Sequence, residues 1–123
     1  MDRKTKGRLA EAKVIAYLIE NGYEVYMPFS DNSKYDVVAI KNGVVKRIST
    51  KFTSVRKQSG SWVVEMRQIY RGKDIINIDK FDNTQYDLIA VYLGPIDRVI
   101  LVEASKATAR GLHIKDNLSG EIA

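Results

Sequence analysis

The sequence contains no cysteine, which excludes disulfide bonds, thiolate nucleophiles and cysteine-type zinc sites. It has one histidine, His113, so an enzyme that needs a histidine pair or a histidine-rich metal site is not expected. The longest helical apolar run, Val14 to Ile19, is far too short to span a bilayer. The charged start, Met1 to Lys6, leads into no signal-peptide core. We therefore expect a soluble, cytoplasmic protein without a membrane partner.

The length and the charge suggest one small domain with a polyanionic partner. A chain of 123 residues suits one compact core, so we interpret residues 1–123 as a single domain. The 20 lysine and arginine residues exceed the 15 aspartate and glutamate residues, which gives a net charge of +5. This sign favours nucleic acid as a partner, although many small soluble proteins are also mildly basic.

The pattern of apolar residues predicts one helix followed by several strands. The helix is expected over Lys6–Asn21, with Thr5 as its N-cap and Gly22 as its stop signal. Its predicted apolar stripe consists of Leu9, Ala12, Ile15, Ala16, Leu18 and Ile19. The predicted strands are 23–29, 35–40, 44–52, 62–69, 86–93 and 98–103. Since little helix separates the strands, we expect an α+β fold, with a mixed sheet and the first helix packed on one face.

Two of these strands form a hairpin that carries an acid and a lysine. The turn Asn42-Gly43 is a strong hairpin signal. Asp36 opens the first strand, and Ser49 and Lys51 share one face near the end of the second. The hairpin can therefore bring Asp36 and Lys51 to one end and one face of the sheet.

An acid and a lysine in this arrangement are how some nucleases hold a metal ion. A carboxylate suits Mg²⁺, with Mn²⁺ as a possible substitute, and the lysine can stabilise a phosphate as charge develops. One carboxylate holds Mg²⁺ poorly, and Glu11 borders the predicted apolar stripe and could reach the sheet. Each residue also has a simpler interpretation. Glu11 could be an acid that the helix dipole favours near a helix N-terminus, and Asp36 could make a local hydrogen bond in a turn. Lys51 could be a strand lysine that points into solvent. Only their joint spacing favours a site.

The residues around this hairpin resemble a known family. The chain is similar to the small PD-(D/E)XK endonucleases, in particular to the branch that includes group I intron homing endonucleases. The resemblance spans about residues 5–103 and implies a restriction-endonuclease-like core, in which helices flank a mixed sheet. The segments that carry the resemblance are Lys6–Ala16, Asn21–Val25, Pro28–Ser33, Tyr35–Val38, Tyr86–Tyr92 and Val99–Val102.

The resemblance also assigns roles to the site residues. Glu11 matches the helix acid, Asp36 the motif aspartate and Lys51 the motif lysine. Ser49 departs from the family, which has Glu, Asp or, in the homing branch, Gln at this position. Three interpretations of Ser49 follow. In the first, Glu11 and Asp36 are enough to hold the metal ion, and in the second, Glu65 on the neighbouring strand replaces the missing acid. In the third interpretation the site is inactive and the protein only binds DNA.

These residues favour a Mg²⁺-dependent DNA endonuclease. Basic and amide side chains that follow the hairpin are candidates for contacts with phosphates and base edges, and a solvated strand face is the alternative. These candidates are Arg56, Lys57, Gln58, Arg67 and Arg71. Because a duplex needs two cuts, we expect a homodimer or a larger symmetric oligomer. Two alternatives remain: a Holliday-junction resolvase of the same fold, and a non-catalytic nucleic-acid-binding protein with a degenerate site.

Overall fold

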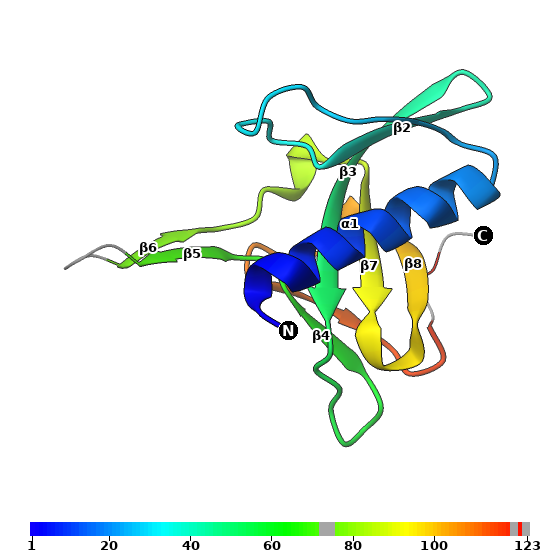
Figure 1. The fold of residues 1–123 in the computed structure, drawn as a ribbon. Helices are drawn as coiled ribbons and strands as arrows, with labels where there is room; N and C mark the ends of the chain where they lie inside the picture. The colour runs from blue at the N-terminus through cyan, green and yellow to red at the C-terminus, as the bar shows by residue number, and fades with distance from the viewer. Residues whose placement is uncertain (72–75, 119–120, 122–123) are drawn as a thin grey trace.

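A five-stranded sheet, crossed on one face by helix α1 (Arg3–Glu20), forms the centre of the molecule in the computed structural model (Figure 1). The strand order is β1-β2-β3-β7-β8. The strands are β1 (Glu24–Tyr26), β2 (Val37–Lys41), β3 (Val44–Thr53), β7 (Leu88–Leu93) and β8 (Arg98–Glu103). Since β3 and β7 run parallel and the other neighbours run antiparallel, the sheet is mixed, and the predicted α+β fold is confirmed.

The structure describes residues 1–71, 76–118 and 121, without the side chains of 68–71 and 76–79. Within this part of the chain, two smaller sheets accompany the large one. One pairs β4 (Trp62–Glu65) with β9 (Gly111–Ile114), and the other pairs β5 (Gln68–Arg71) with β6 (Ile76–Asp79). Three short 3₁₀ helices are η1 (Asn83–Gln85), η2 (Gly94–Ile96) and η3 (Ala104–Lys106).

Helix α1 begins earlier than predicted. Its N-cap is Asp2, whose carboxylate accepts a hydrogen bond from the Thr5 backbone nitrogen at 2.7 Å, so the prediction that Thr5 caps the helix is wrong. An aspartate at this position satisfies one of the free N–H groups of the first turn. The helix ends as predicted, since Gly22 adopts a positive φ of 85° directly after Asn21.

The helix confirms only part of the predicted apolar stripe: Leu18 is buried, and Leu9 and Ile15 pack against the core. Its buried residues are Ala10, Val14 and Leu18. Ala12, Ala16 and Ile19 of the predicted stripe face solvent, and Ile19 is 59% exposed. Apolar residues occur on more than one side of this helix, so helical spacing alone could not select the buried side.

The two faces of the large sheet are covered by different layers. Toward α1, Ile48 of β3 packs with Val37, Leu88 and the helix. The next residue, Ser49, lies beside Ile89, which packs in the core on the opposite face. In the described residues that face is covered by β4 and β9 rather than by a helix, which differs from the flanking helices that the resemblance implied. Its covering side chains are Trp62, Val64, Met66, Leu112 and Ile114.

Two strand predictions need correction. The predicted strand 62–69 is interrupted after Glu65, where the Arg67 backbone nitrogen bonds to the Glu65 carboxylate, and the chain changes partner from β9 to β6. The segment 111–114, for which no strand was predicted, forms β9 because Leu112 and Ile114 alternate into the core. Within the described part of the chain, no helix is long and apolar enough to cross a membrane.

Candidate active site

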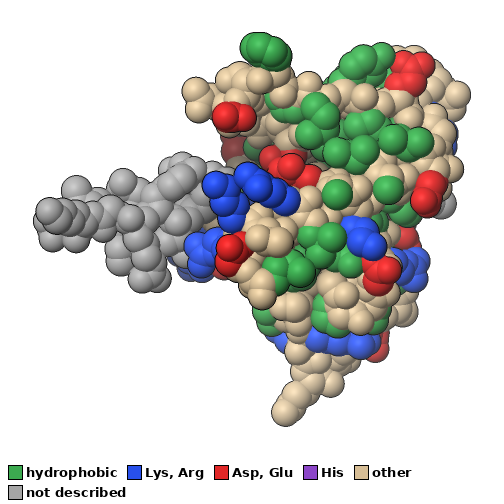
Figure 2. Space-filling model, in the orientation of Figure 1, with side chains coloured by type: hydrophobic (Ala, Val, Ile, Leu, Met, Phe, Trp, Pro, Cys, Tyr) green, Lys and Arg blue, Asp and Glu red, His purple; other side chains and the backbone are tan. Residues whose placement is uncertain are grey.

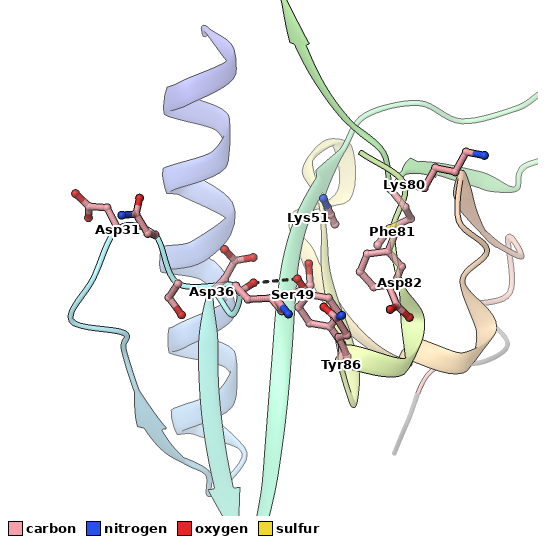
Figure 3. Close-up of a pocket in the computed structure, with 13 residues that line it drawn as sticks. Asp31, Asp36, Ser49, Lys51, Lys80, Phe81, Asp82 and Tyr86 are labelled. Atoms are coloured by element: carbon pink, nitrogen blue, oxygen red, sulfur yellow. Dashed lines mark hydrogen bonds between the residues drawn. The ribbon is translucent and has the colours of Figure 1, made fainter. Parts of the chain in front are cut away.

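A cavity of about 580 Å³ lies beside the β2–β3 hairpin (Figure 3). Asp36, Ser49 and Lys51 all line it, so the structure brings together the three residues that sequence analysis placed at the end of the hairpin. The opposite wall comes from the segment before β7, at Lys80–Asp82, Gln85 and Tyr86. The remaining lining residues are Asp31, Asn32, Ser33, Lys34 and Met66.

Asp36 is fixed to the neighbouring strand by hydrogen bonds. Its backbone nitrogen donates to the Ile48 carbonyl at 3.1 Å. Its carboxylate Oδ2 accepts from the Thr50 backbone nitrogen at 2.8 Å and from the Thr50 hydroxyl at 3.3 Å. Among the described residues no donor bonds to Oδ1, so the carboxylate is held at one oxygen and available to a ligand at the other.

Glu11 approaches Asp36 from helix α1. Burial raises the pKa of the Glu11 carboxyl, and the negative charge of Asp36 raises it further, while Arg8 acts in the opposite direction. Glu11 does not line the cavity, but this mutual repulsion shows that it lies close to Asp36. The carboxylates of Glu11 and Asp36, from different elements, are therefore near enough to repel each other, and a cation near both would relieve this repulsion.

Lys51 is largely removed from water. Burial lowers the pKa of its ammonium group, and the nearby charges of Asp36 and Glu65 act in the opposite direction. Within the described residues, Lys51 has no ion pair with a carboxylate at 4.0 Å or less. Its positive charge therefore lies in a poorly solvated environment, where it acts more strongly on an added anion than in water.

Ser49 occupies the position where the resemblance implies a further acid or a glutamine. It is only 6% exposed and lines the cavity. Its side chain forms no hydrogen bond with another described residue. A hydroxyl at this place can bond a water molecule or a phosphate oxygen, but it brings no negative charge.

Glu65, the candidate for a relocated acid, is near Lys51 but is bonded elsewhere. Its carboxylate accepts hydrogen bonds from the Arg67 backbone nitrogen at 2.9 Å and from the guanidinium at 2.8 and 3.1 Å. Arg67 accordingly lowers the pKa of Glu65. Glu65 is not among the residues that line the cavity.

The site offers hard oxygen donors for a divalent cation. Across residues 1–71, 76–118 and 121, no group of three or more histidine, cysteine, aspartate or glutamate side chains is arranged to hold a metal ion. Glu11 and Asp36 supply two carboxylates, and the Ser49 hydroxyl lines the same cavity as Asp36. This donor set fits a cation of the Mg²⁺ type, which prefers oxygen ligands and keeps several waters.

The predicted DNA-contacting residues lie apart from the cavity. Arg56 donates to the Gly60 carbonyl at 2.9 Å, and its guanidinium lies 5.0 Å from the Trp62 ring centre. Lys57 and Gln58 are exposed in the same loop, and Arg67 is paired with Glu65. The side chain of Arg71, also predicted, lies outside the described residues. Contact of these residues with DNA therefore stays a prediction.

Several residues that line the cavity were not predicted from the sequence. Lys34, Lys80 and Tyr86 all line it, yet none was among the predicted site residues. Lys80 and Tyr86 lie about 30 residues or more beyond the hairpin, and no local pattern connects them with it. Only the folded sheet, in which β7 lies beside β3, brings them together.

Comparisons with known proteins identify the family and the fold. The profile of the PD-(D/E)XK endonuclease family matches residues 1–118, and the chain belongs to this family of nucleases. No curated protein matches the sequence. A solved structure of a bacterial homing endonuclease, I-Ssp6803I, has the same fold, with a TM-score of 0.76 and 19% sequence identity. The match covers 93% of this chain and 78% of that one.

Proposed function

We propose that the protein is a metal-dependent DNA endonuclease of the homing type, which hydrolyses phosphodiester bonds. The observation that supports this most directly is the meeting of Asp36, Ser49 and Lys51 in one cavity of a PD-(D/E)XK chain. DNA is proposed as the substrate because the family consists of endonucleases and the chain carries a net charge of +5.

Glu11 and Asp36 are the residues that would hold the cation, Mg²⁺ or Mn²⁺. When bound, such an ion polarises the phosphodiester and makes a water molecule more acidic. Asp36 contributes a carboxylate whose orientation is already fixed by Thr50. Glu11 contributes the second charge from α1, and Ser49 contributes a neutral hydroxyl.

Lys51 would stabilise the phosphate as negative charge develops on it. Its ammonium group is buried beside Asp36, where water does not screen it effectively. Because burial lowers its pKa, this lysine also loses its proton at a lower pH than a solvated lysine does.

A homo-oligomer is part of the proposal, because cutting both strands of a duplex requires two sites. Strand β1 is an edge of the large sheet, and exposed apolar side chains lie on it and just after it. Tyr26, Met27 and Phe29 are 51%, 52% and 106% exposed. Figure 2 shows hydrophobic side chains gathered in this region above α1. Light scattering coupled to gel filtration measures the mass directly.

A cleavage assay on several DNA substrates tests the proposal. The protein is incubated with supercoiled plasmid, linear duplex and a four-way junction, each with Mg²⁺, Mn²⁺ or EDTA. We expect metal-dependent nicking or cutting of duplex DNA. Preferential cleavage of the junction would favour the resolvase alternative. Binding without cleavage under every condition would contradict the proposal and favour a DNA-binding protein with a degenerate site.

A further inference from the structure

We propose that Tyr86 is a positioning residue, which braces the segment Ser30–Tyr35 across the cavity and thereby fixes Asp36. We call this segment the entry segment, because it leads directly into Asp36 and β2. The inference rests on the proposed nuclease function. It concerns a residue on the wall opposite the hairpin, which was not among the site residues predicted from the sequence.

The hydroxyl of Tyr86 reaches across to the backbone of the entry segment. It donates a hydrogen bond to the Lys34 carbonyl at 2.9 Å (Figure 3, dashed line). Among the described residues, this is the one hydrogen bond that the backbone of the entry segment receives from outside it. The other bonds of that backbone are local turns, such as Ser33 nitrogen to Ser30 carbonyl at 3.2 Å. Most of the segment is exposed, so local turns alone hold it weakly.

The ring of Tyr86 is itself held firmly. It stacks on Phe81 with ring centres 4.9 Å apart and an angle of 19° between the planes. It also meets Tyr35 edge to face at 5.7 Å and 89°. Aromatic pairs of this kind prefer these two geometries. The hydroxyl therefore projects from a fixed ring, which lets it hold the Lys34 carbonyl in one place.

The chemistry of the phenol suits this role. Burial raises the pKa of Tyr86, and the charge of Asp36 raises it further. The hydroxyl therefore keeps its proton through neutral and moderately alkaline pH, and it remains a donor there. Tyr86 and Asp36 line the same cavity, and Asp36 directly follows the entry segment, so a displaced entry segment would move the carboxylate on which cation binding depends.

Two matched variants separate positioning from general stability. Tyr86→Phe removes the hydroxyl and keeps the ring that stacks on Phe81. Tyr92→Phe is the control, because the Tyr92 hydroxyl also makes one hydrogen bond, to Asp97 at 2.7 Å, and it does not line the cavity. Both variants lose one tyrosine hydroxyl. Thermal unfolding of the two proteins shows whether the loss of stability is comparable.

The first readout is amide hydrogen exchange of peptides that cover residues 30–36, measured without metal or DNA. We expect faster exchange in Tyr86→Phe and unchanged exchange in Tyr92→Phe. The second readout is the single-turnover cleavage rate as a function of Mg²⁺ concentration. We expect Tyr86→Phe to need more Mg²⁺ for half-maximal rate and to cleave about tenfold more slowly below saturation, which corresponds to one net hydrogen bond of about 1.4 kcal/mol.

Each outcome decides the proposal. Faster exchange together with the shifted Mg²⁺ dependence supports it. If exchange at residues 30–36 is unchanged in Tyr86→Phe, the hydroxyl does not brace the entry segment, and the proposal is overturned. If exchange is faster but cleavage equals that of the wild type at every Mg²⁺ concentration, Tyr86 does not position Asp36. If the wild type never cleaves DNA, the proposed function fails, and with it the positioning for catalysis, while the exchange experiment still decides whether the brace exists.

Discussion

Arg47 and Lys51 lie on the same face of β3, and each lies near an aspartate, but the two acid–base pairs differ in construction. Asp87 accepts hydrogen bonds from the Arg47 backbone nitrogen at 2.8 Å and from its guanidinium at 3.0 and 3.4 Å. The pKa of Asp87 is lowered accordingly, chiefly by these side-chain bonds. Each side chain of this pair therefore has its opposite charge and its hydrogen-bond partners in the other residue, and the pair links β3 to the start of β7.

In the second pair, Asp36 and Lys51 do not bond to each other, so both charged groups remain available to a ligand. Asp36 is bonded to Thr50 rather than to the lysine. Burial lowers the pKa of Lys51, and no ion pair within 4.0 Å to a described residue compensates for it. Both side chains line the cavity. The comparison shows that a charged pair built for structure is closed, whereas this one retains capacity for a ligand.

The largest expected effect comes from removing either member of the open pair. Asp36→Ala removes a cation ligand, and Lys51→Ala removes the charge beside the phosphate. Either loss of roughly 3–4 kcal/mol of transition-state stabilisation would slow cleavage by about two to three orders of magnitude. DNA binding should persist, because other basic residues supply most of the affinity. Single-turnover rates and a binding titration on folded variants, checked by circular dichroism, measure both.

The next largest effect should come from Ser49. Ser49→Glu adds a carboxylate to the cavity and should raise the affinity for Mg²⁺ or Mn²⁺ by about tenfold, since cation affinity follows the number of charged ligands. Isothermal titration measures the gain. Ser54→Glu is the control, because Ser54 is exposed and outside the cavity lining. An equal gain in both variants, or none in Ser49→Glu, would argue against a cation site at Asp36.

The closed pair should affect stability and not chemistry. Asp87→Ala should lower the free energy of unfolding by about 1–2 kcal/mol, because it removes charged hydrogen bonds that are partly exposed to solvent. Urea unfolding measures the change. Because the folded-state pKa of Asp87 is lowered, its contribution is present at neutral pH and is lost as the pH falls through that pKa. A large loss of cleavage in this variant, with its fold intact, would contradict the claim that only the pair of Asp36 and Lys51 takes part in the chemistry.

The smallest effect concerns the pH profile of cleavage. The lowered pKa of Lys51 means that the rate should begin to fall on the alkaline side at a lower pH than for an ordinary lysine. The pKa of Glu11 is raised in the metal-free protein, so protons should begin to compete with Mg²⁺ at a higher pH than they would at an ordinary glutamate. Lys51→Arg, which keeps its charge at every accessible pH, should remove the alkaline limb. An alkaline limb unchanged in Lys51→Arg would assign it to another group.

Local sequence patterns predicted the hairpin and the meeting of Asp36, Ser49 and Lys51 at its end, but not the parts that depend on distant packing. Asn42 and Gly43 adopt positive φ angles of 52° and 76°, as the turn signal required, and the alternation along β3 correctly separated Ile48 from Ser49. The predicted apolar stripe of α1 was only partly right, because packing on the sheet selects which of the apolar sides of the helix is buried. Tyr86 was missed because it reaches the cavity through the parallel pairing of β3 and β7.

The most direct test compares Asp36→Asn with Asp87→Asn. Each variant removes one negative charge and keeps the size of the side chain, so their effects on electrostatic attraction to DNA are matched. The measurement is the single-turnover cleavage rate of duplex DNA in Mg²⁺. We expect Asp36→Asn to lose cleavage by at least about a hundredfold and Asp87→Asn to cleave at the wild-type rate while unfolding more easily. Equal cleavage by wild type and Asp36→Asn would contradict the assignment of this cavity as the catalytic site.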